Sequence, residues 1–231
     1  MLAKVSHLRL SAMSRVLVLT TLALSLTAVS AEAQVAVPSS QQPDHFRDTS
    51  MLVPPAGAKV AIVEWEDLEC PACAHAFPFV HMAVDHYKIP YVRYDFLIPG
   101  HIWSREGAIY ARYLQDKVSP ELATQYRREV FASQFKFASK EDLNRFTQEF
   151  FTRNGKQLPF VIDPTGQLAR EVEKDVALGN KLGLTETPTL VVVTAKGWIQ
   201  VKDVSDLYQA IDQAEASVGG TPAAEHHKTT K

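Results

Sequence analysis

Two apolar runs with a helical segment between them dominate the first half of the chain. Residues 59–65 predict a buried strand, because no polar side chain stands between Lys59 and Glu64. Residues 71–87 predict a helix, and residues 91–97 predict a second strand. The apolar stripe of this helix is Cys73, Phe77, Val80, Val84 and Tyr87. Because a helix separates the two strands, we expect them to be parallel.

Only helical patterns occur from about residue 103 to residue 155. Apolar residues recur at helical spacing in three segments, so we expect three helices inserted at about residues 103–160. The apolar positions are Ile102, Ile109, Tyr110, Tyr113 and Leu114, then Leu122, Tyr126 and Val130, then Leu143, Phe146 and Phe150. These faces must pack against another part of the chain, unless the protein forms oligomers.

After about residue 160 the sequence has both helical and strand patterns. Asp163-Pro164 predicts the start of a fourth helix, with Gly183 as its C-terminal cap. Residues 189–194 and 198–201 predict two antiparallel strands joined by a turn.

Asp203 caps the last predicted helix. The tail over residues 217–231 is small and polar, and we expect it to be disordered.

The first 33 residues have the pattern of a cleavable signal peptide. Lys4, Arg9 and Arg15 give a basic start, and residues 16–29 are apolar except for Ser and Thr. Ala31 and Ala33 place small side chains at the −3 and −1 positions before Gln34. The apolar run is short for a membrane span, although an uncleaved anchor is the alternative. We expect an exported protein, in the periplasm or a similar compartment, with no stable membrane insertion after cleavage.

Residues 34–55 read as a flexible leader with a weak edge-strand pattern over residues 45–53. The domain that follows extends over residues 56–216. With 231 residues and 46% hydrophobic content, the chain can bury a full core as one domain or as one domain with an inserted subdomain. A net charge of −2 gives no reason to expect a nucleic-acid partner.

Cys70 and Cys73 are the only two cysteines, and two residues separate them. Such a pair can close into a disulfide, open to a dithiol or hold part of a metal site. His75 could add a third metal ligand, but structural zinc usually takes four protein ligands. We therefore expect no metal and no cofactor. Cys70 precedes the helix and is predicted to be the nucleophile and the more exposed of the two sulfurs. Cys73 lies one turn inside the helix and is predicted to be the shielded, resolving cysteine.

The order of elements resembles the thioredoxin fold. A strand leads to Cys-x-x-Cys at a helix start, a second strand follows, and Pro188 precedes a β-hairpin and a final helix. The inserted helices resemble the DsbA-like branch of the thioredoxin superfamily. This resemblance implies an α/β protein, with a central mixed sheet flanked by helices and an inserted all-helical subdomain.

Further residues match the motifs of that family. Thr187-Pro188 resembles the cis-proline loop, which implies that Thr187 and Pro188 contact an extended substrate strand. Glu64, six residues before Cys70, matches the buried acid, which implies a proton relay to Cys73 through water. The alternative is that Glu64 is a structural acid paired with Lys or Arg.

The dipeptide between the cysteines departs from the typical DsbA pattern. Pro71-Ala72 stands where those enzymes have Pro-His, and the missing histidine is the one that stabilises the thiolate. The helix N-terminus lowers the pKa of a thiol placed there. We expect Glu66, Asp67 and Glu69 to oppose that shift if they lie near the sulfur.

The resemblance implies an exported thiol:disulfide oxidoreductase. As an oxidase it would donate disulfides to unfolded or reduced secreted proteins and be re-oxidised by a membrane partner of the DsbB or VKOR type. Disulfide reductase or isomerase activity at the same site is one alternative. A binding or chaperone module with a structural disulfide is the alternative from another class.

Overall fold

The computed structural model describes residues 46–219. The predicted signal peptide (residues 1–33), the leader before residue 46 and the tail beyond residue 219 lie outside the described residues. Within the described range, no helix is both long and apolar enough to cross a bilayer.

A four-stranded mixed sheet forms the centre, in the order β2-β1-β3-β4. Strands β1 (Val60–Glu66) and β2 (Tyr91–Asp95) are parallel, as the helix between them predicted. Strand β3 (Thr189–Thr194) pairs antiparallel with β1 and with β4 (Gly197–Val201). The predicted α/β class and hairpin are therefore confirmed.

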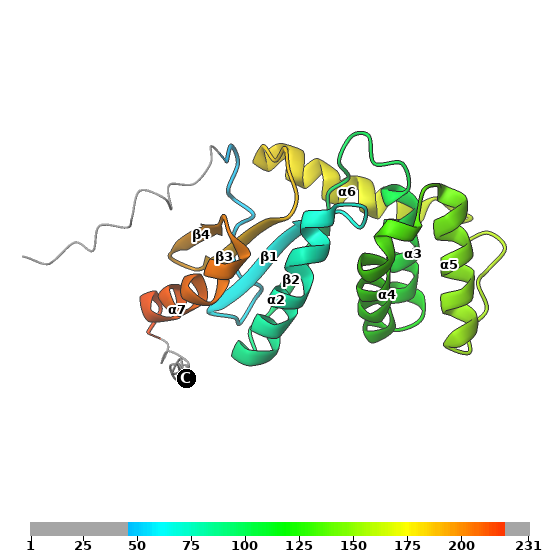
Figure 1. Ribbon diagram of the computed structural model, residues 1–231. Coiled ribbons are helices and arrows are strands. Elements are labelled where there is room, and N and C mark those ends of the chain that lie inside the picture. Colours follow the sequence, from blue (N-terminus) through cyan, green and yellow to red (C-terminus); the bar gives the residue numbers. More distant parts are fainter. Residues whose placement is uncertain (1–45, 220–231) are drawn as a thin grey trace, which may run out of the picture. The chain divides into compact units, whose positions relative to one another are not determined.

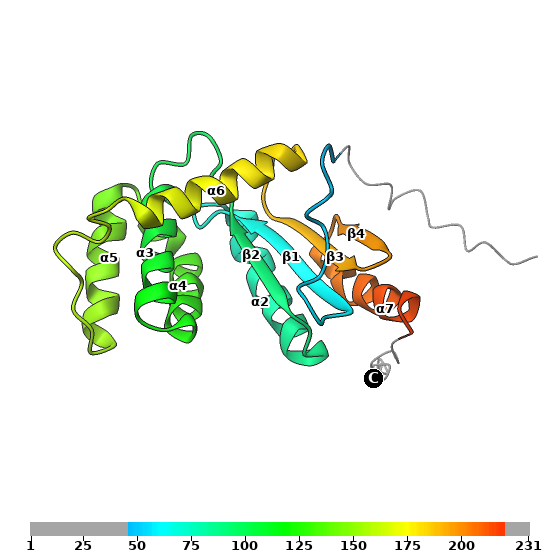
Figure 2. The same ribbon diagram turned by 180° about the vertical axis from the view of Figure 1, so that it is seen from behind.

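Helices cover both faces of the sheet (Figure 1). Helices α2 (Pro71–Tyr87) and α7 (Leu207–Ser217) lie on one face, where they bury Ile62 and Val192. Helix α6 (Gln167–Leu182) lies on the other face, as the reverse view shows (Figure 2). Alternate residues of each strand thus enter two separate cores.

The three predicted inserted helices are present. They are α3 (Ser104–Lys117), α4 (Pro120–Ser133) and α5 (Lys140–Arg153), with a short 3₁₀ turn η2 (Gln134–Lys136) after α4. Ser119 and Ser139 cap α4 and α5, each accepting a hydrogen bond from an amide of the first turn. Their shared core also contains Cys70, Cys73 and Phe77, so the inserted helices pack against the start of α2.

Three local predictions were wrong. Residues 46–53 form no strand; the Arg47 amide instead donates to the carbonyl of Leu182 at the end of α6 (2.8 Å). Helix α6 begins at Gln167, because Gly166 before it has a left-handed backbone (φ 68°). Ile102 is exposed, whereas its neighbour Trp103 is buried.

The last helical region begins, as predicted, after Asp203, whose carboxylate accepts from the Ser205 amide. Its first turn is a 3₁₀ turn, η3 (Val204–Asp206), which leads directly into α7.

Candidate active site

The two cysteines lie at the N-terminus of α2. Cys70 is the N-cap residue, with an extended backbone (φ −77°, ψ 120°), and Pro71 occupies the first helical turn, where no amide donor is needed. The two thiols are free, and Cys70 is 8% exposed against 1% for Cys73. The predicted difference in exposure is therefore present. Pro71 and Ala72 between them are exposed to solvent.

The loop before β3 brings a distant segment to the nucleophile. The Thr187-Pro188 peptide bond is cis, as predicted. Cys70 Sγ lies 3.3 Å from the Thr187 carbonyl oxygen, to which the protonated thiol donates a hydrogen bond, although 117 positions separate the two residues. The fold thus places the Thr187 carbonyl next to the Cys70 thiol.

The two thiols are electrostatically different. A hydrogen bond from the Cys73 thiol lowers the pKa of Cys70 to about 5, against the effect of burial, and the amides of Cys73 and Ala72 add to this. Burial raises the pKa of Cys73, and its contact with Cys70 adds to the rise. Near neutral pH the reduced pair therefore holds a thiolate at Cys70 and a thiol at Cys73.

The acidic residues before Cys70 do not act as expected. Asp67 accepts from the Ile98 amide and contacts His101 Nδ1, each at 2.8 Å. Glu69 Oε2 accepts from the Trp103 amide (2.7 Å) at the start of α3. These carboxylates stabilise the loop and the helix N-terminus, and neither is a main cause of the pKa shift of Cys70.

Glu64 is a buried acid with one neutral partner. Its side chain is 1% exposed, and Oε2 accepts a hydrogen bond from the Tyr91 hydroxyl (2.5 Å). Burial raises the pKa of Glu64 to about 8, the charge of Glu66 adds to the rise, and the Tyr91 bond opposes it. The charge of Glu64 is among the causes that raise the pKa of Cys73. Within residues 46–219 no Lys or Arg side chain forms an ion pair with Glu64, which contradicts the alternative of a structural acid paired with Lys or Arg.

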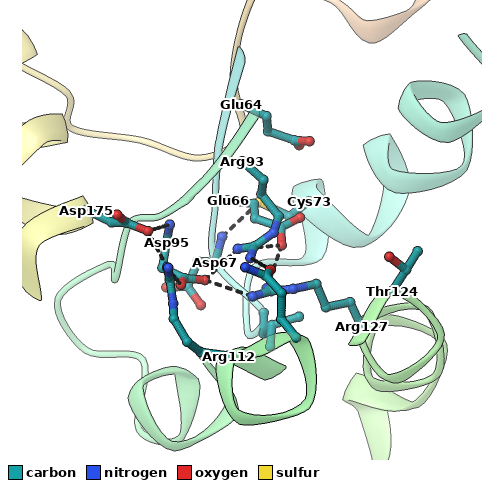
Figure 3. A network of polar contacts seen from close by, with 12 residues as sticks. Glu64, Glu66, Asp67, Cys73, Arg93, Asp95, Arg112, Thr124, Arg127 and Asp175 are labelled. Atoms are coloured by element: carbon teal, nitrogen blue, oxygen red, sulfur yellow. Dashed lines mark hydrogen bonds and ion pairs between the residues drawn. The ribbon is translucent and has the colours of Figure 1, made fainter. Parts of the chain in front are cut away.

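A buried ion network beside this site was not predicted from the sequence. Three arginines converge on Glu66 and Asp95 (Figure 3). Arg127 of α4 donates to Glu66 (2.7 Å) and to Asp95 (3.2 Å), and Arg93 donates to Asp95 (2.9 Å). Arg112 of α3 binds Asp95 (2.6 Å) and also contacts Asp175 of α6. The network links the sheet to the inserted helices.

The sequence carries a signal for this network. Glu64 and Glu66 alternate along β1, and Tyr91, Arg93 and Asp95 alternate along β2. Residues two apart in a strand lie on one face, and Glu64 pairs in register with Arg93. A polar stripe at this period on two adjacent strands predicts a polar layer between sheet and helix.

Gln134 is another residue that the sequence did not single out. From η2 its amide donates to the carbonyls of Leu68 (2.7 Å) and Cys70 (3.0 Å). The inserted helices thereby hold the loop that carries the nucleophile.

Metal ligands are not grouped in the described part of the chain. Within residues 46–219, no three His, Cys, Asp or Glu side chains are placed together as metal ligands would be. His75 is exposed, and its ring packs beside Phe79, with 5.4 Å between centroids.

Comparison with known proteins agrees with this geometry. Residues 47–213 match the family model described as Thioredoxin. No curated protein sequence matches the chain significantly.

Similar solved structures share the fold at low sequence identity. Oxidised BdbD from Bacillus subtilis is 17% identical, with a TM-score of 0.57, and the match covers 76% of this chain and 97% of BdbD. Alpha-DsbA1 from Wolbachia pipientis is 16% identical, with a TM-score of 0.53, over 74% and 96% of the two chains. Alpha-DsbA2 from Wolbachia pipientis, described as a thiol-disulfide exchange protein, is 19% identical, with a TM-score of 0.51, over 70% and 84%.

Proposed function

The chain belongs to the thioredoxin family, and from this premise we propose that it is a thiol:disulfide oxidoreductase that uses Cys70 and Cys73. The observation that supports this best is the position of Cys70. Its thiol lies at a helix N-terminus, has a lowered pKa and is 3.3 Å from the Thr187 carbonyl of the cis-proline loop. A thiolate at such a place is suited to attack a disulfide or to leave from one. The similarity to a thiol-disulfide exchange protein gives further support.

In the proposed cycle the protein acts as an oxidase. The thiolate of a reduced secreted protein attacks Cys70 in the Cys70–Cys73 disulfide, and Cys73 leaves and takes up a proton. A second substrate thiolate then attacks the substrate sulfur of the mixed disulfide, which forms the substrate disulfide and releases the Cys70 thiolate. The lowered pKa of Cys70 supports this direction, because a stabilised thiolate favours the reduced enzyme.

The substrate contact is proposed at the cis-proline loop. Thr187 and Pro188 present their backbone beside Cys70, where an extended peptide can add main-chain hydrogen bonds. Glu64 is proposed to exchange a proton with Cys73, directly or through water. A membrane protein of the DsbB or VKOR type is proposed to restore the disulfide.

A Cys73→Ala variant tests the exchange chemistry. Without the resolving thiol, mixed disulfides through Cys70 should accumulate and appear on non-reducing gels, while a Cys70→Ala variant should trap none. A binding module with a static disulfide would trap nothing in either variant, which would contradict the proposal. Equilibration of the wild-type pair with glutathione tests the direction: a potential near about −120 mV supports an oxidase, and one near about −270 mV supports a reductase.

We also propose that the protein is exported to the periplasm or a similar oxidising compartment. The basic start, the apolar run and the small residues over residues 1–33 support this, because dithiol oxidases work where disulfides persist. Expressed with its leader, the protein in the periplasmic fraction should have the mass of a chain that begins at Gln34. A membrane-bound chain that retains residues 1–33 would contradict cleavage.

A further inference from the structure

The two carboxyl oxygens of Glu64 differ in their hydrogen bonds. Oε2 accepts the Tyr91 hydroxyl hydrogen bond at 2.5 Å, whereas the buried Oε1 has no hydrogen-bond partner among the described residues. The side chain is 1% exposed, so bulk water does not readily replace a missing partner. One oxygen is therefore fixed by the phenol, and the other is left to carry the proton.

The residue opposite Glu64 does not provide the missing partner. Arg93 pairs with Glu64 in the β1–β2 register, but its guanidinium reaches Asp95 (2.9 Å) and lies 3.7 Å from Glu66. Figure 3 draws no contact between Glu64 and the arginines. The Tyr91 hydroxyl is thus the hydrogen-bond donor that Glu64 has within residues 46–219.

Packing holds the Tyr91 ring in place. Its ring meets His81 of α2 edge to face, with 5.6 Å between centroids, and the side chain packs against the core between the sheet and α2. Because α2 also carries Cys73, the helix that bears the resolving thiol is the one that packs on the phenol.

We propose that Tyr91 is a positioning residue for proton exchange between Glu64 and Cys73, holding Glu64 by one oxygen and easing its ionisation. This inference rests on the proposed function. When Cys73 attacks a mixed disulfide, its thiol proton passes to the Glu64 carboxylate. The Cys73–Cys70 bond then forms, the bond from Cys70 to the substrate sulfur breaks, and that sulfur leaves as a thiolate. In the reverse direction Glu64 returns the proton to Cys73.

The phenol matters because a donated hydrogen bond favours the charged carboxylate. The other titratable or charged groups around the pair are Glu66 on β1, Arg93 on β2, Cys73 and His81 on α2, and Arg127 and Arg128 on α4. A Tyr91→Phe change leaves all of these in place and removes one donor. A hydrogen bond to a charged group corresponds to a shift of about 1–2 pH units.

The test measures the rates of the two steps by which glutathione disulfide oxidises the reduced protein. In the first step Cys70 displaces one glutathione, and in the second Cys73 displaces the other. For Tyr91→Phe, the pH at which the rate of the second step increases should be higher by about 1–2 pH units than in the wild type. The rate of the second step at pH 7 should fall about tenfold or more. The pH profile of the first step, which belongs to Cys70, should stay unchanged.

Tyr87→Phe is the matched control. Tyr87 also donates to a carboxylate, Asp212 (2.7 Å), but on the side of α7, so its loss should leave both profiles unchanged. Glu64→Gln should abolish the pH-dependent rise that Tyr91→Phe only displaces.

Two outcomes would contradict the proposals, and they are distinguishable. If both steps proceed but the second profile is the same in Tyr91→Phe and wild type, the role of Tyr91 is refuted and the proposed function stands. If no mixed disulfide with glutathione forms at Cys70 in any variant, the proposed function fails, and the role of Tyr91 fails with it.

Discussion

Glu64 and Glu66 lie two residues apart on β1, face the same side of the sheet and are each 1% exposed, yet they have different partners. Glu64 accepts one hydrogen bond from a phenol, while Glu66 is bound by Arg127 at 2.7 Å. Burial raises the pKa of both carboxyls, and the charges of Arg93 and Arg127 oppose the rise at both, but only at Glu66 does a hydrogen bond from Arg127 oppose it as well. Position and burial are matched, so what differs between the two carboxyls is the bound partner, a neutral phenol at Glu64 and a guanidinium at Glu66.

The network around Glu66 pairs buried carboxyls with buried guanidiniums. Glu66, Asp95 and Asp175 face Arg93, Arg112 and Arg127, so formal charges balance within the cluster. Although burial acts in the opposite direction, the three arginines hold the pKa of Asp95 well below its usual range. Buried charges of this kind are tolerated only when they are paired.

The largest expected effect comes from removing a shared partner of the network. Arg127→Met leaves Glu66 without its closest cation and Asp95 with one fewer, and breaking a buried pair in this way costs about 3–5 kcal/mol. The free energy of unfolding in urea should fall by that amount.

The neighbouring residue provides the control for Arg127. Arg128 is exposed and lies 6.0 Å from the Phe77 ring centre, so Arg128→Met should cost less than about 1 kcal/mol. Equal losses of stability in the two variants would show that the network contributes nothing specific.

Glu64→Gln should raise the free energy of unfolding, whereas Arg127→Met should lower it. The pKa of Glu64 is raised from 4.5 to about 8 in the fold, so between these values the folded chain keeps a proton that the unfolded chain releases. Stability contributed by this group therefore falls as the pH rises above 4.5. Glutamine cannot ionise and still accepts from Tyr91, so the variant should be more stable by roughly 3 kcal/mol at pH 7. Urea unfolding should show this difference vanishing below about pH 4.5.

Glu66→Gln completes the comparison with the smallest effect. Glutamine can still accept a hydrogen bond from Arg127 but brings no charge. Because burial also raises the pKa of Glu66, with the charges of Arg127 and Arg93 opposing the rise, the free energy of unfolding at pH 7 should rise by less than in Glu64→Gln, as measured in urea. A gain of stability in Glu66→Gln as large as that in Glu64→Gln would show that the partners do not separate the two acids.

Much of the fold follows from local patterns in the sequence. The limits of α2 and β3, the parallel β1–β2 pair and the three inserted helices agree with spacings of 3.6 and 2 residues. The Cys-x-x-Cys motif at a helix start also indicated the more exposed thiol, because Cys73 lies on the apolar stripe of the helix with Phe77 and Cys70 precedes the helix.

Long-range partners could not be predicted in the same way. No local pattern indicates that Arg127 reaches Glu66, that Gln134 holds the Cys70 loop or that Tyr91 binds Glu64, since these residues are 61, 64 and 27 positions apart. The edge strand predicted over residues 45–53 was wrong for a related reason, because the Arg47 amide donates to the Leu182 carbonyl at the end of α6, far along the chain.

The sequence by itself located the proposed redox pair: Cys70 precedes a helix, Cys73 lies inside its first turn, and Pro188 precedes a strand far along the chain. Tertiary structure alone decided the protonation chemistry around that pair. Hydrogen bonds and ion pairs depend on distances of a few ångströms between side chains from different elements, and only packing of the inserted helices on the sheet sets those distances. Glu64 and Glu66 are therefore alike in sequence and distinct in the folded protein.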